Sequence, residues 1–240
     1  MERKQFIRTL SFLAFSGPMA WAACSKNESV AILENGEDVT VNNSCSVTPS
    51  ETAGPFPTKT PSSYTRSDIR KGDNLGVNMA ALITVANVND NCNPLAGALV
   101  DIWHCDVDGN YSQYGDTQMQ PSNYQSVNWC RGRLVTDENG LVNFQTIFPG
   151  WYMGRATHIH VHIYDASGQS LLVTQIAFQD SLSDDVNTNG SQYGYKKGIS
   201  GYTYNSKDNV FSDGVDKEMA TVTGSIASGF EMKITIKVEA

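Results

Sequence analysis

The sequence predicts an all-β protein, an antiparallel β-sandwich with long loops and little helix. Its apolar residues fall in short runs, several of which alternate with polar residues, and turn residues separate the runs. Glycine occurs 20 times and proline 8 times, and only 18% of the residues are charged, as in a loop-rich globular protein. No segment shows the 3.6-residue apolar period of a long amphipathic helix. Short strands at this spacing are typical of two packed sheets.

The expected strands follow one another from the middle of the chain to its end. Two pairs read as hairpins, because "ENG" at 138–140 and "ASGQ" at 166–169 are turn sequences between apolar runs. Residues 180–215 are rich in Asn, Ser, Asp and Gly, which predicts a long ordered loop. The runs expected to form strands are 81–88, 98–105, 132–137, 141–148, 158–165, 170–180 and 230–240.

The N-terminal residues resemble an export signal. Residues 1–23 combine a basic start with an apolar stretch too short to span a bilayer, and they end in small residues before Cys24. Cleavage there predicts a lipid anchor on Cys24, a polar tether over 24–48 and a domain over 49–240. We therefore expect an exported protein, in the periplasm or on the cell surface. A twin-arginine route, suggested by "ERKQFIR", and ordinary secretion with Cys24 as a free or disulfide-bonded thiol stay open as alternatives.

The net charge excludes some classes of binding partner, and the cysteine content bears on the cellular compartment. The formal net charge of −8 argues against nucleic acid and anionic membrane surfaces as partners. With Cys24 set aside, four cysteines remain, and an oxidising compartment allows two disulfides among them. A zinc site is the weaker alternative, because the sequence has no C-x-x-C pair. Three pairings are open among Cys45, Cys92, Cys105 and Cys130.

Three of the four histidines, His158, His160 and His162, occupy alternate positions of one expected strand. Alternate strand residues share a face, so two neighbouring imidazoles can bind a common metal ion. For an isolated H-x-H pair, histidines hydrogen-bonded on a surface strand are an equally good interpretation. Two tyrosines favour the metal: Tyr152 lies in the turn before the strand, and Tyr111 lies in a loop after an earlier strand. Phenolate oxygens are hard anionic donors that suit Fe(III).

The spacing of these residues makes the pattern specific. A tyrosine stands eight residues after a tryptophan, a P-G-x-Y turn follows, an arginine precedes the H-x-H pair by three residues, and a T-Q pair lies fifteen residues beyond the second histidine. These positions are Trp103, Tyr111, Pro149, Gly150, Tyr152, Arg155, His158, His160, Thr174 and Gln175. With "TAGPF" at 52–56, "RSDIR" at 66–70 and "YNSKDNVFSDG" at 204–214, the chain from about residue 45 to 240 resembles the intradiol aromatic-ring dioxygenase family, in particular its secreted, lipoprotein-type members.

The resemblance implies one Fe(III) per chain, with four ligands: Tyr111, Tyr152, His158 and His160. It also implies a small aromatic diol and O2 as substrates, cleavage of the catechol-type ring between its hydroxylated carbons, and a muconate-type diacid as product. In this family the tyrosine that matches Tyr152 leaves the metal as substrate enters and accepts a proton. Arg155 would stabilise developing negative charge, and Gln175 would hydrogen-bond beside the substrate. A buried strand glutamine bonded to backbone is the alternative for Gln175.

Two other functions fit parts of the pattern. One is a non-catalytic, exported β-sandwich lipoprotein that binds a catecholate or sugar ligand, although such a module would not need all four ligand positions. The other is a copper or zinc site made of His158, His160 and His162, which leaves both tyrosines out. The chain lacks the helical N-terminal pattern through which cytosolic relatives dimerise, so the oligomeric state stays open. We expect three other chemically capable side chains to lie outside the site: His104, Tyr114 and Asp165.

Overall fold

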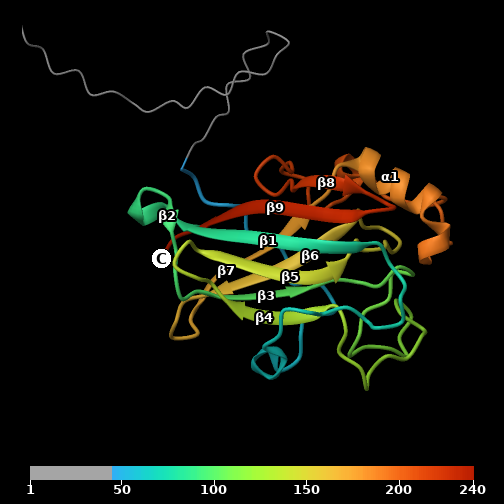
Figure 1. Cartoon of the computed structure of the whole chain (residues 1–240), viewed down its shortest axis with the longest axis horizontal. Helices are drawn as coiled ribbons and strands as arrows, with labels where there is room; N and C mark the ends of the chain where they lie inside the picture. Colours follow the sequence, from blue (N-terminus) through green and yellow to red (C-terminus); the bar gives the residue numbers. More distant parts are fainter. Residues whose placement is uncertain (1–44) are drawn as a thin grey trace, which may run out of the picture. The chain divides into compact units, whose positions relative to one another are not determined.

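The structure, a computed structural model, describes residues 45–240, which form two β-sheets packed face to face (Figure 1). The predicted β-sandwich is confirmed, and every expected run overlaps an observed strand. The first sheet contains β1 (Asn78–Asn87), β2 (Asn93–Pro94), β5 (Leu141–Ile147), β8 (Thr221–Ser225) and β9 (Gly229–Val238). The second contains β3 (Leu99–Trp103), β4 (Arg131–Val135), β6 (His158–Tyr164) and β7 (Ser170–Ala177).

Among the named strands of the described domain, pairing is antiparallel except at one place. In the second sheet the order is β4-β3-β6-β7, and all three pairs are antiparallel. In the first sheet β1 pairs antiparallel with β2 and β5 but in parallel with β9. A hairpin turn forces its two strands to run antiparallel, whereas β9 reaches β1 through a long connection that imposes no such direction.

The core lies between the two sheets and is made by alternate residues of each strand. In β1 the residues Met79, Ala81, Ile83 and Val85 are all buried and belong to the main hydrophobic cluster. β6 contributes Ile159, Val161 and Ile163 to the same cluster. Because successive strand residues point to opposite faces, the histidines of β6 must lie on the outer face of the second sheet.

One prediction for the connections is wrong. Residues 180–215 are not a loop throughout, because Asp180–Asn189 form the helix α1. Ser, Asp and Asn favour turns in isolation, since their side chains bond nearby backbone groups. Here packing overrides that preference: Val186 is fully buried in the main cluster and Leu182 packs against it. Four short 3₁₀ helices complete the connections: η1 Pro61–Tyr64, η2 Val88–Asp90, η3 Ser191–Tyr193 and η4 Asn205–Lys207.

The structure contains one of the two expected disulfides. Cys45 is bonded to Cys92, but Cys105 and Cys130 are free, buried thiols. They lie in different hydrophobic clusters: Cys105 packs with Phe56 and other residues on the outer side of the second sheet, and Cys130 packs in the main core. The expectation of a second disulfide is therefore wrong, because the two side chains are directed into different clusters.

The first described residues already belong to the domain surface. In the last part of the predicted tether, Thr48 is buried, and its backbone N–H donates to Lys237 O in β9 at 3.0 Å. The predicted signal at 1–23 and the tether up to residue 44 lie outside the described residues. Within residues 45–240, no helix has the length and apolar character needed to cross a membrane.

Candidate metal centre

Two histidines of β6 lie side by side on the outer face of the second sheet. His158 and His160 are 2% and 1% exposed, and their Nε2 atoms are 3.1 Å apart. His158 Nδ1 lies 2.6 Å from Ala156 O, so this nitrogen carries the proton and donates it to the carbonyl. The lone pair of His158 Nε2 therefore points toward His160 and away from the backbone.

Neighbouring strands fix the plane of His160. It is paired with Trp103 of β3 on one side and with Gln175 of β7 on the other. The Trp103 and His160 rings are stacked with centroids 4.9 Å apart and an interplanar angle of 3°. Cross-strand neighbours on one face are close enough to pack directly, so this row follows from the strand register.

Tyr111 comes from the loop that follows β3 and reaches the same point. Its Oη lies 3.3 Å from His158 Nε2, and the side chain is fully buried. The side chain of Gln120 fixes its backbone: Tyr111 N donates to Gln120 Oε1 at 2.6 Å, and Gln120 Nε2 donates to Tyr111 O at 2.8 Å. Phe56 stacks on the Tyr111 ring with centroids 4.8 Å apart.

Tyr152 comes from the turn before β6, and two glycines allow this turn to approach the Tyr111 loop. A Cβ at Gly109 would lie 2.2 Å from Trp151 O, and a Cβ at Gly150 would lie 2.5 Å from Asp106 O. Only glycine permits so close an approach of two backbones. As a result, the Tyr152 ring centroid lies 5.7 Å from that of Tyr111 and 5.7 Å from that of His158.

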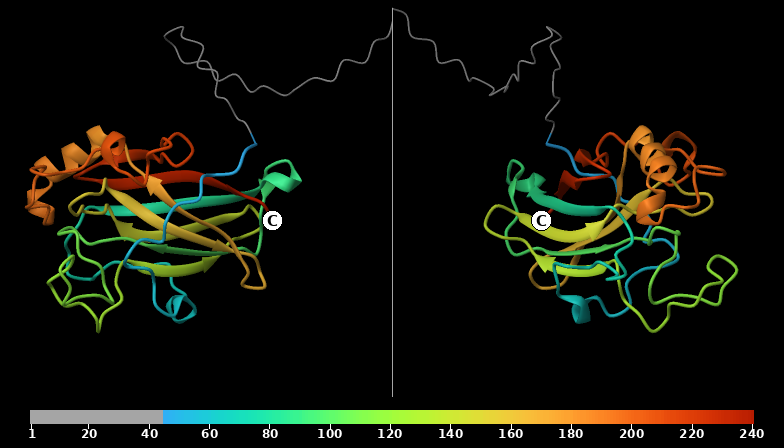
Figure 2. Two further views of the ribbon diagram at one scale, coloured as in Figure 1. Left: turned by 180° about the vertical axis from the view of Figure 1, so that it is seen from behind. Right: turned by 45° about the vertical axis from the view of Figure 1, so that its right-hand side comes forward.

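The N-terminal segment of the described chain covers the histidines. Glu51 N donates to Val173 O of β7, and the segment then passes over the outer face of the sheet (Figure 2, left, in blue). At Gly54, with a φ of +67°, a Cβ would lie 3.0 Å from His160 Cε1. Residues 52–56 therefore form a close-fitting cover in which position 54 leaves no room for a side chain.

Burial sets the protonation of these four side chains. It lowers the pKa of His158 to about 3 and the pKa of His160 well below its usual value, helped by the positive charge of Arg155. Both imidazoles are therefore neutral near pH 7. Burial also raises the pKa of Tyr111 and, less strongly, that of Tyr152, where Arg155 and a hydrogen bond from Tyr111 act in the opposite direction.

Arg155 is held beside Tyr152 by two partners. Its Nε lies 2.9 Å from both carboxylate oxygens of Asp208, and its Nη2 donates to Gln175 Oε1 at 2.5 Å. Asp208 Oδ2 also accepts from Ala156 N at 2.8 Å. The amide of Gln175 donates in turn to Thr52 O at 2.8 Å. The guanidinium is therefore fixed in orientation by a connected set of buried hydrogen bonds.

The four side chains fit a metal ion. Tyr111 and Tyr152 supply hard oxygen atoms, and the two neutral imidazoles supply nitrogen lone pairs, a donor set that suits iron. Metal ligands must be deprotonated, and a bound trivalent cation would offset the cost of deprotonating the two buried phenols. His158 Nε2 lies 3.3 Å from Tyr111 Oη and 3.1 Å from His160 Nε2, and donor atoms this close can bind one ion.

The other chemically capable residues lie outside this cluster. His162 is half-buried, and its ring nitrogens contact Ser170 Oγ and Tyr164 Oη, each at 2.8 Å. Buried His104 contacts Thr146 Oγ1 and Cys105 O. Tyr114 donates to Pro57 O, and the carboxylate of Asp165 accepts hydrogen bonds within its own turn. These hydrogen bonds therefore go to groups other than the four proposed ligands.

Several supporting residues did not emerge from the sequence. Asp208, which holds Arg155, lies within "YNSKDNVFSDG", so the family resemblance pointed to its segment but not to its role. Gly54 and Phe56 lie within "TAGPF" in the same way. Gln120 is in an irregular loop with no motif, and its contact with Tyr111 depends on tertiary packing.

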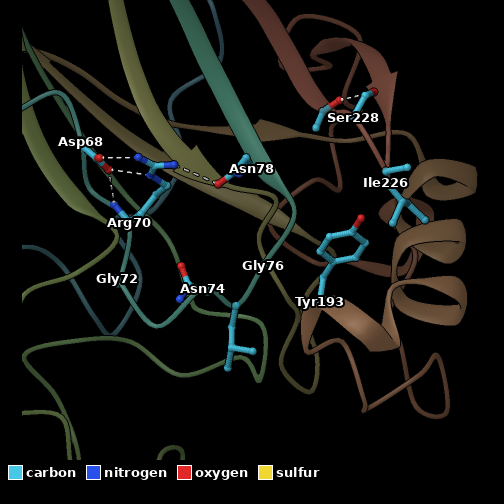
Figure 3. Close-up of a pocket in the computed structure, with 12 residues that line it drawn as sticks. Asp68, Arg70, Gly72, Asn74, Gly76, Asn78, Tyr193, Ile226 and Ser228 are labelled. Carbon is cyan, nitrogen blue, oxygen red and sulfur yellow. Dashed lines mark hydrogen bonds and ion pairs between the residues drawn. The ribbon is translucent and has the colours of Figure 1, made fainter.

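A depression of the surface lies apart from this cluster. A polar depression of about 430 Å³ lies near the start of β1 and is lined by residues that include Asp68, Arg70, Asn78 and Tyr193 (Figure 3). Arg70 is already paired there: it donates to Asp68 at 2.7 and 2.9 Å and to Asn78 Oδ1 at 3.2 Å. The cationic group of this depression is therefore neutralised, and none of the four tyrosine and histidine side chains lines it.

Comparison with known proteins agrees with this geometry. A family model described as "Dioxygenase" matches residues 52–192, more than half of the chain. A chlorocatechol 1,2-dioxygenase of Rhodococcus opacus is 32% identical over 105 residues, and a catechol 1,2-dioxygenase of Acinetobacter baylyi is 30% identical over 141 residues. The first match covers 36% of this chain and 38% of the relative, and the second covers 51% and 39%. The matched part thus spans less than half the length of either relative.

A solved structure gives a match over most of the chain. An intradiol ring-cleavage dioxygenase from Tetranychus urticae superposes with a TM-score of 0.70 at 29% identity, covering 81% of this chain and 95% of that one. Together with the family match, this similarity defines the class of the protein. The chain belongs to the intradiol dioxygenase family.

Proposed function

We propose that this protein is a non-haem Fe(III) intradiol dioxygenase that cleaves a catechol-type ring with O2 to a muconate-type diacid. The observation that carries the proposal is the convergence of Tyr111, Tyr152, His158 and His160, from two loops and one strand, at one buried point. Their residue types and spacing suit one Fe(III) per chain. Bound there, the ion would supply Lewis-acid and redox activation of the aromatic diol toward O2.

The two tyrosines have different parts in this proposal. Tyr111 is fully buried and stacked by Phe56, so it is suited to a permanent ligand. Tyr152 is only partly buried and lies next to Met153, which is 84% exposed. Its phenol oxygen interacts with Arg155, which favours the anionic form. Tyr152 is therefore suited to move aside when the diol enters and to accept a proton from one of its hydroxyls.

Arg155 and Gln175 are suited to act on the substrate side of the site. Arg155 keeps a fixed orientation through Asp208, so its positive charge can stabilise negative charge that develops on the ring or on oxygen. Gln175 links Arg155 to the covering segment through Thr52 O.

The alternative of a non-catalytic module that binds a catecholate or a sugar gains no support from these contacts. A binding module would not require two tyrosines, two neutral histidines and a fixed arginine at one point. We also propose that the protein is exported; the Cys45–Cys92 disulfide is typical of an oxidising compartment and supports this.

The test is the visible spectrum of the purified, iron-loaded protein. Tyrosinate bound to Fe(III) gives a broad charge-transfer band, which should shift to longer wavelength when catechol is added without O2. Admitting O2 should then return the original band and yield a diacid product. An iron-loaded protein that is colourless would contradict the proposed ligands, and a spectrum that shifts without turnover would favour the binding module.

A further inference from the structure

A second group of polar side chains lies apart from the tyrosines and histidines. The carboxyl groups of Glu51, Asp213 and Glu218 converge so that one oxygen of each lies within 4.8 Å of the others. They come from two segments: Glu51 from the covering N-terminal segment, and Asp213 and Glu218 from the connection between η4 and β8. We refer to Glu51, Asp213 and Glu218 as the carboxylate cluster.

Glu218 is the most unusual member. Its side chain is 0% exposed, and its Oε1 accepts from Thr174 Oγ1 at 3.0 Å, but its buried Oε2 has no hydrogen-bond partner. The backbone holds it in place, because Ala177 N donates to Glu218 O and Glu218 N donates to Val215 O, both at 2.9 Å. A buried carboxylate oxygen without a partner is costly, so its place in the cluster indicates a missing ligand.

The cluster carries several carboxyl groups and no direct cationic partner among the described ion pairs of residues 45–240. The charge of Arg155 acts on Glu51, but its guanidinium is hydrogen-bonded to Asp208 and Gln175. Burial, followed by the neighbouring carboxylates, raises the pKa of Glu51 and raises that of Glu218 to about 7. Lys217 Nζ donates instead to Val47 O.

We propose that Glu51, Asp213 and Glu218 bind a divalent cation, Ca²⁺ in preference to Mg²⁺. Mg²⁺ usually keeps several waters and binds one or two carboxylates, whereas Ca²⁺ takes about six to eight oxygens in a flexible geometry and accepts several carboxylates. Three carboxyl groups whose oxygens all lie within 4.8 Å of one another therefore suit Ca²⁺. Asp213 is exposed and Glu51 half-buried, so water can reach the site and complete the coordination.

Such a cation would join segments that support the proposed iron site. Glu51 precedes Thr52, whose carbonyl binds Gln175, and Asp213 is in the same loop as Asp208, which binds Arg155. The strand β7 connects the two places directly, since Thr174 bonds Glu218 and Gln175 bonds Arg155. Ca²⁺ would therefore stabilise the covering segment and the 208–218 loop against each other.

The experiment measures Ca²⁺ binding to the full, iron-loaded protein after treatment with EGTA, with the iron content measured before and after. Isothermal titration calorimetry should show one saturable Ca²⁺ per chain and a weaker response to Mg²⁺. The midpoint temperature of thermal unfolding should rise by about 5 °C when the Ca²⁺ concentration is about 100 times the dissociation constant. Binding is read without any turnover, so a failure here is distinct from a failure of the proposed dioxygenase activity.

Matched variants decide whether the cluster is responsible. Glu218→Gln and Asp213→Asn should each abolish the Ca²⁺-dependent shift, and Glu138→Gln, which removes one exposed carboxylate from the 138–140 turn, should preserve it. If Glu218→Gln fails to fold, the Asp213→Asn variant, which changes an exposed side chain, provides the test. Absence of saturable binding to the wild type, or an unchanged shift in both cluster variants, would overturn the proposal. Absence of binding would mean that Glu218 instead retains a proton, and an unchanged shift would mean that Ca²⁺ binds elsewhere.

Discussion

Two polar clusters use adjacent residues of β7 but respond to burial in opposite ways. The tyrosine–histidine cluster contacts Gln175 through Arg155, and the carboxylate cluster contacts Thr174 through Glu218. Burial lowers the pKa of His158 to about 3 and raises that of Glu218 to about 7. In both cases the charged form is disfavoured, because a low-dielectric surrounding solvates it poorly.

The two clusters differ in how well their neutral side chains can bind a metal ion. A neutral imidazole keeps a lone pair and is ready to bind a metal, so burial prepares the histidines for their proposed role. A neutral carboxyl group has lost most of its donor strength, so burial makes Glu218 dependent on a proton or a cation. The same physical effect therefore makes one cluster a ready ligand set and the other a site whose charge must be balanced.

The largest effect is expected when a proposed metal ligand is removed. Tyr111→Phe should abolish the visible band and lower ring-cleavage activity by more than about 100-fold, since even supporting residues of metal sites contribute about 10–100-fold. The control is Tyr114→Phe, which removes a phenol bonded to Pro57 O and should leave the band in place. A Tyr111→Phe protein that keeps its colour would contradict the proposed ligand set.

Lowering the pH should destabilise the folded protein, because histidines that are buried in the neutral form bind protons more readily after unfolding. The pKa of His104 is about 4, below the unfolded value of 6.5, so its contribution to stability is complete above pH 6.5 and is lost as the pH falls toward 4. Between pH 7.5 and 4.5 this single group should remove about 2.5 kcal/mol from the free energy of unfolding.

Urea unfolding at several pH values measures this loss. His104→Gln should show a shallower dependence on pH than the wild type over that range, whatever its stability at pH 7.5. Equal pH dependence in the two proteins would show that His104 does not stay neutral in the folded state.

The link between the clusters can be tested at Arg155. Arg155→Lys keeps the positive charge but cannot contact Asp208 and Gln175 together in the same fixed geometry. We expect kcat to fall by about 100-fold, the loss typical of one preorganised charge-stabilising group, with the iron content and visible band retained. Loss of the band in Arg155→Lys would instead assign Arg155 to keeping the site folded.

A smaller effect is expected where the covering segment touches His160. Gly54→Ala combines a strained φ of +67° with a Cβ placed 3.0 Å from His160 Cε1. Gly198→Ala is the control, because its φ of +64° imposes similar strain while its Cβ would meet nothing within 4 Å. Both should lose about 1 kcal/mol of stability, and only Gly54→Ala should also shift the visible band. Equal spectra would show that the cover can move away from His160.

Much of the fold could be predicted from the chain, because alternation of apolar and polar residues is a local property. That pattern located the expected strands, although it missed β8, an edge strand whose residues are mostly exposed. It also missed α1, since the residues of 180–189 favour turns and the helix is stabilised by packing of Val186 and Leu182 against the core. Strand direction was equally inaccessible, because the parallel pairing of β1 with β9 depends on how a long connection packs.

The sequence by itself determined the family and the identities of the four proposed ligands, since the spacing of Tyr111, Tyr152, His158 and His160 is written in the chain. Tertiary structure alone decided which residues position them. Asp208, Gly54 and Gln120 act through contacts between segments far apart in sequence, and the spacing of residues along one segment carries no information about those contacts. The carboxylate cluster shows this most fully, because Glu51 and Glu218 meet only when the N-terminal segment and the residues before β8 pack against the edge of β7.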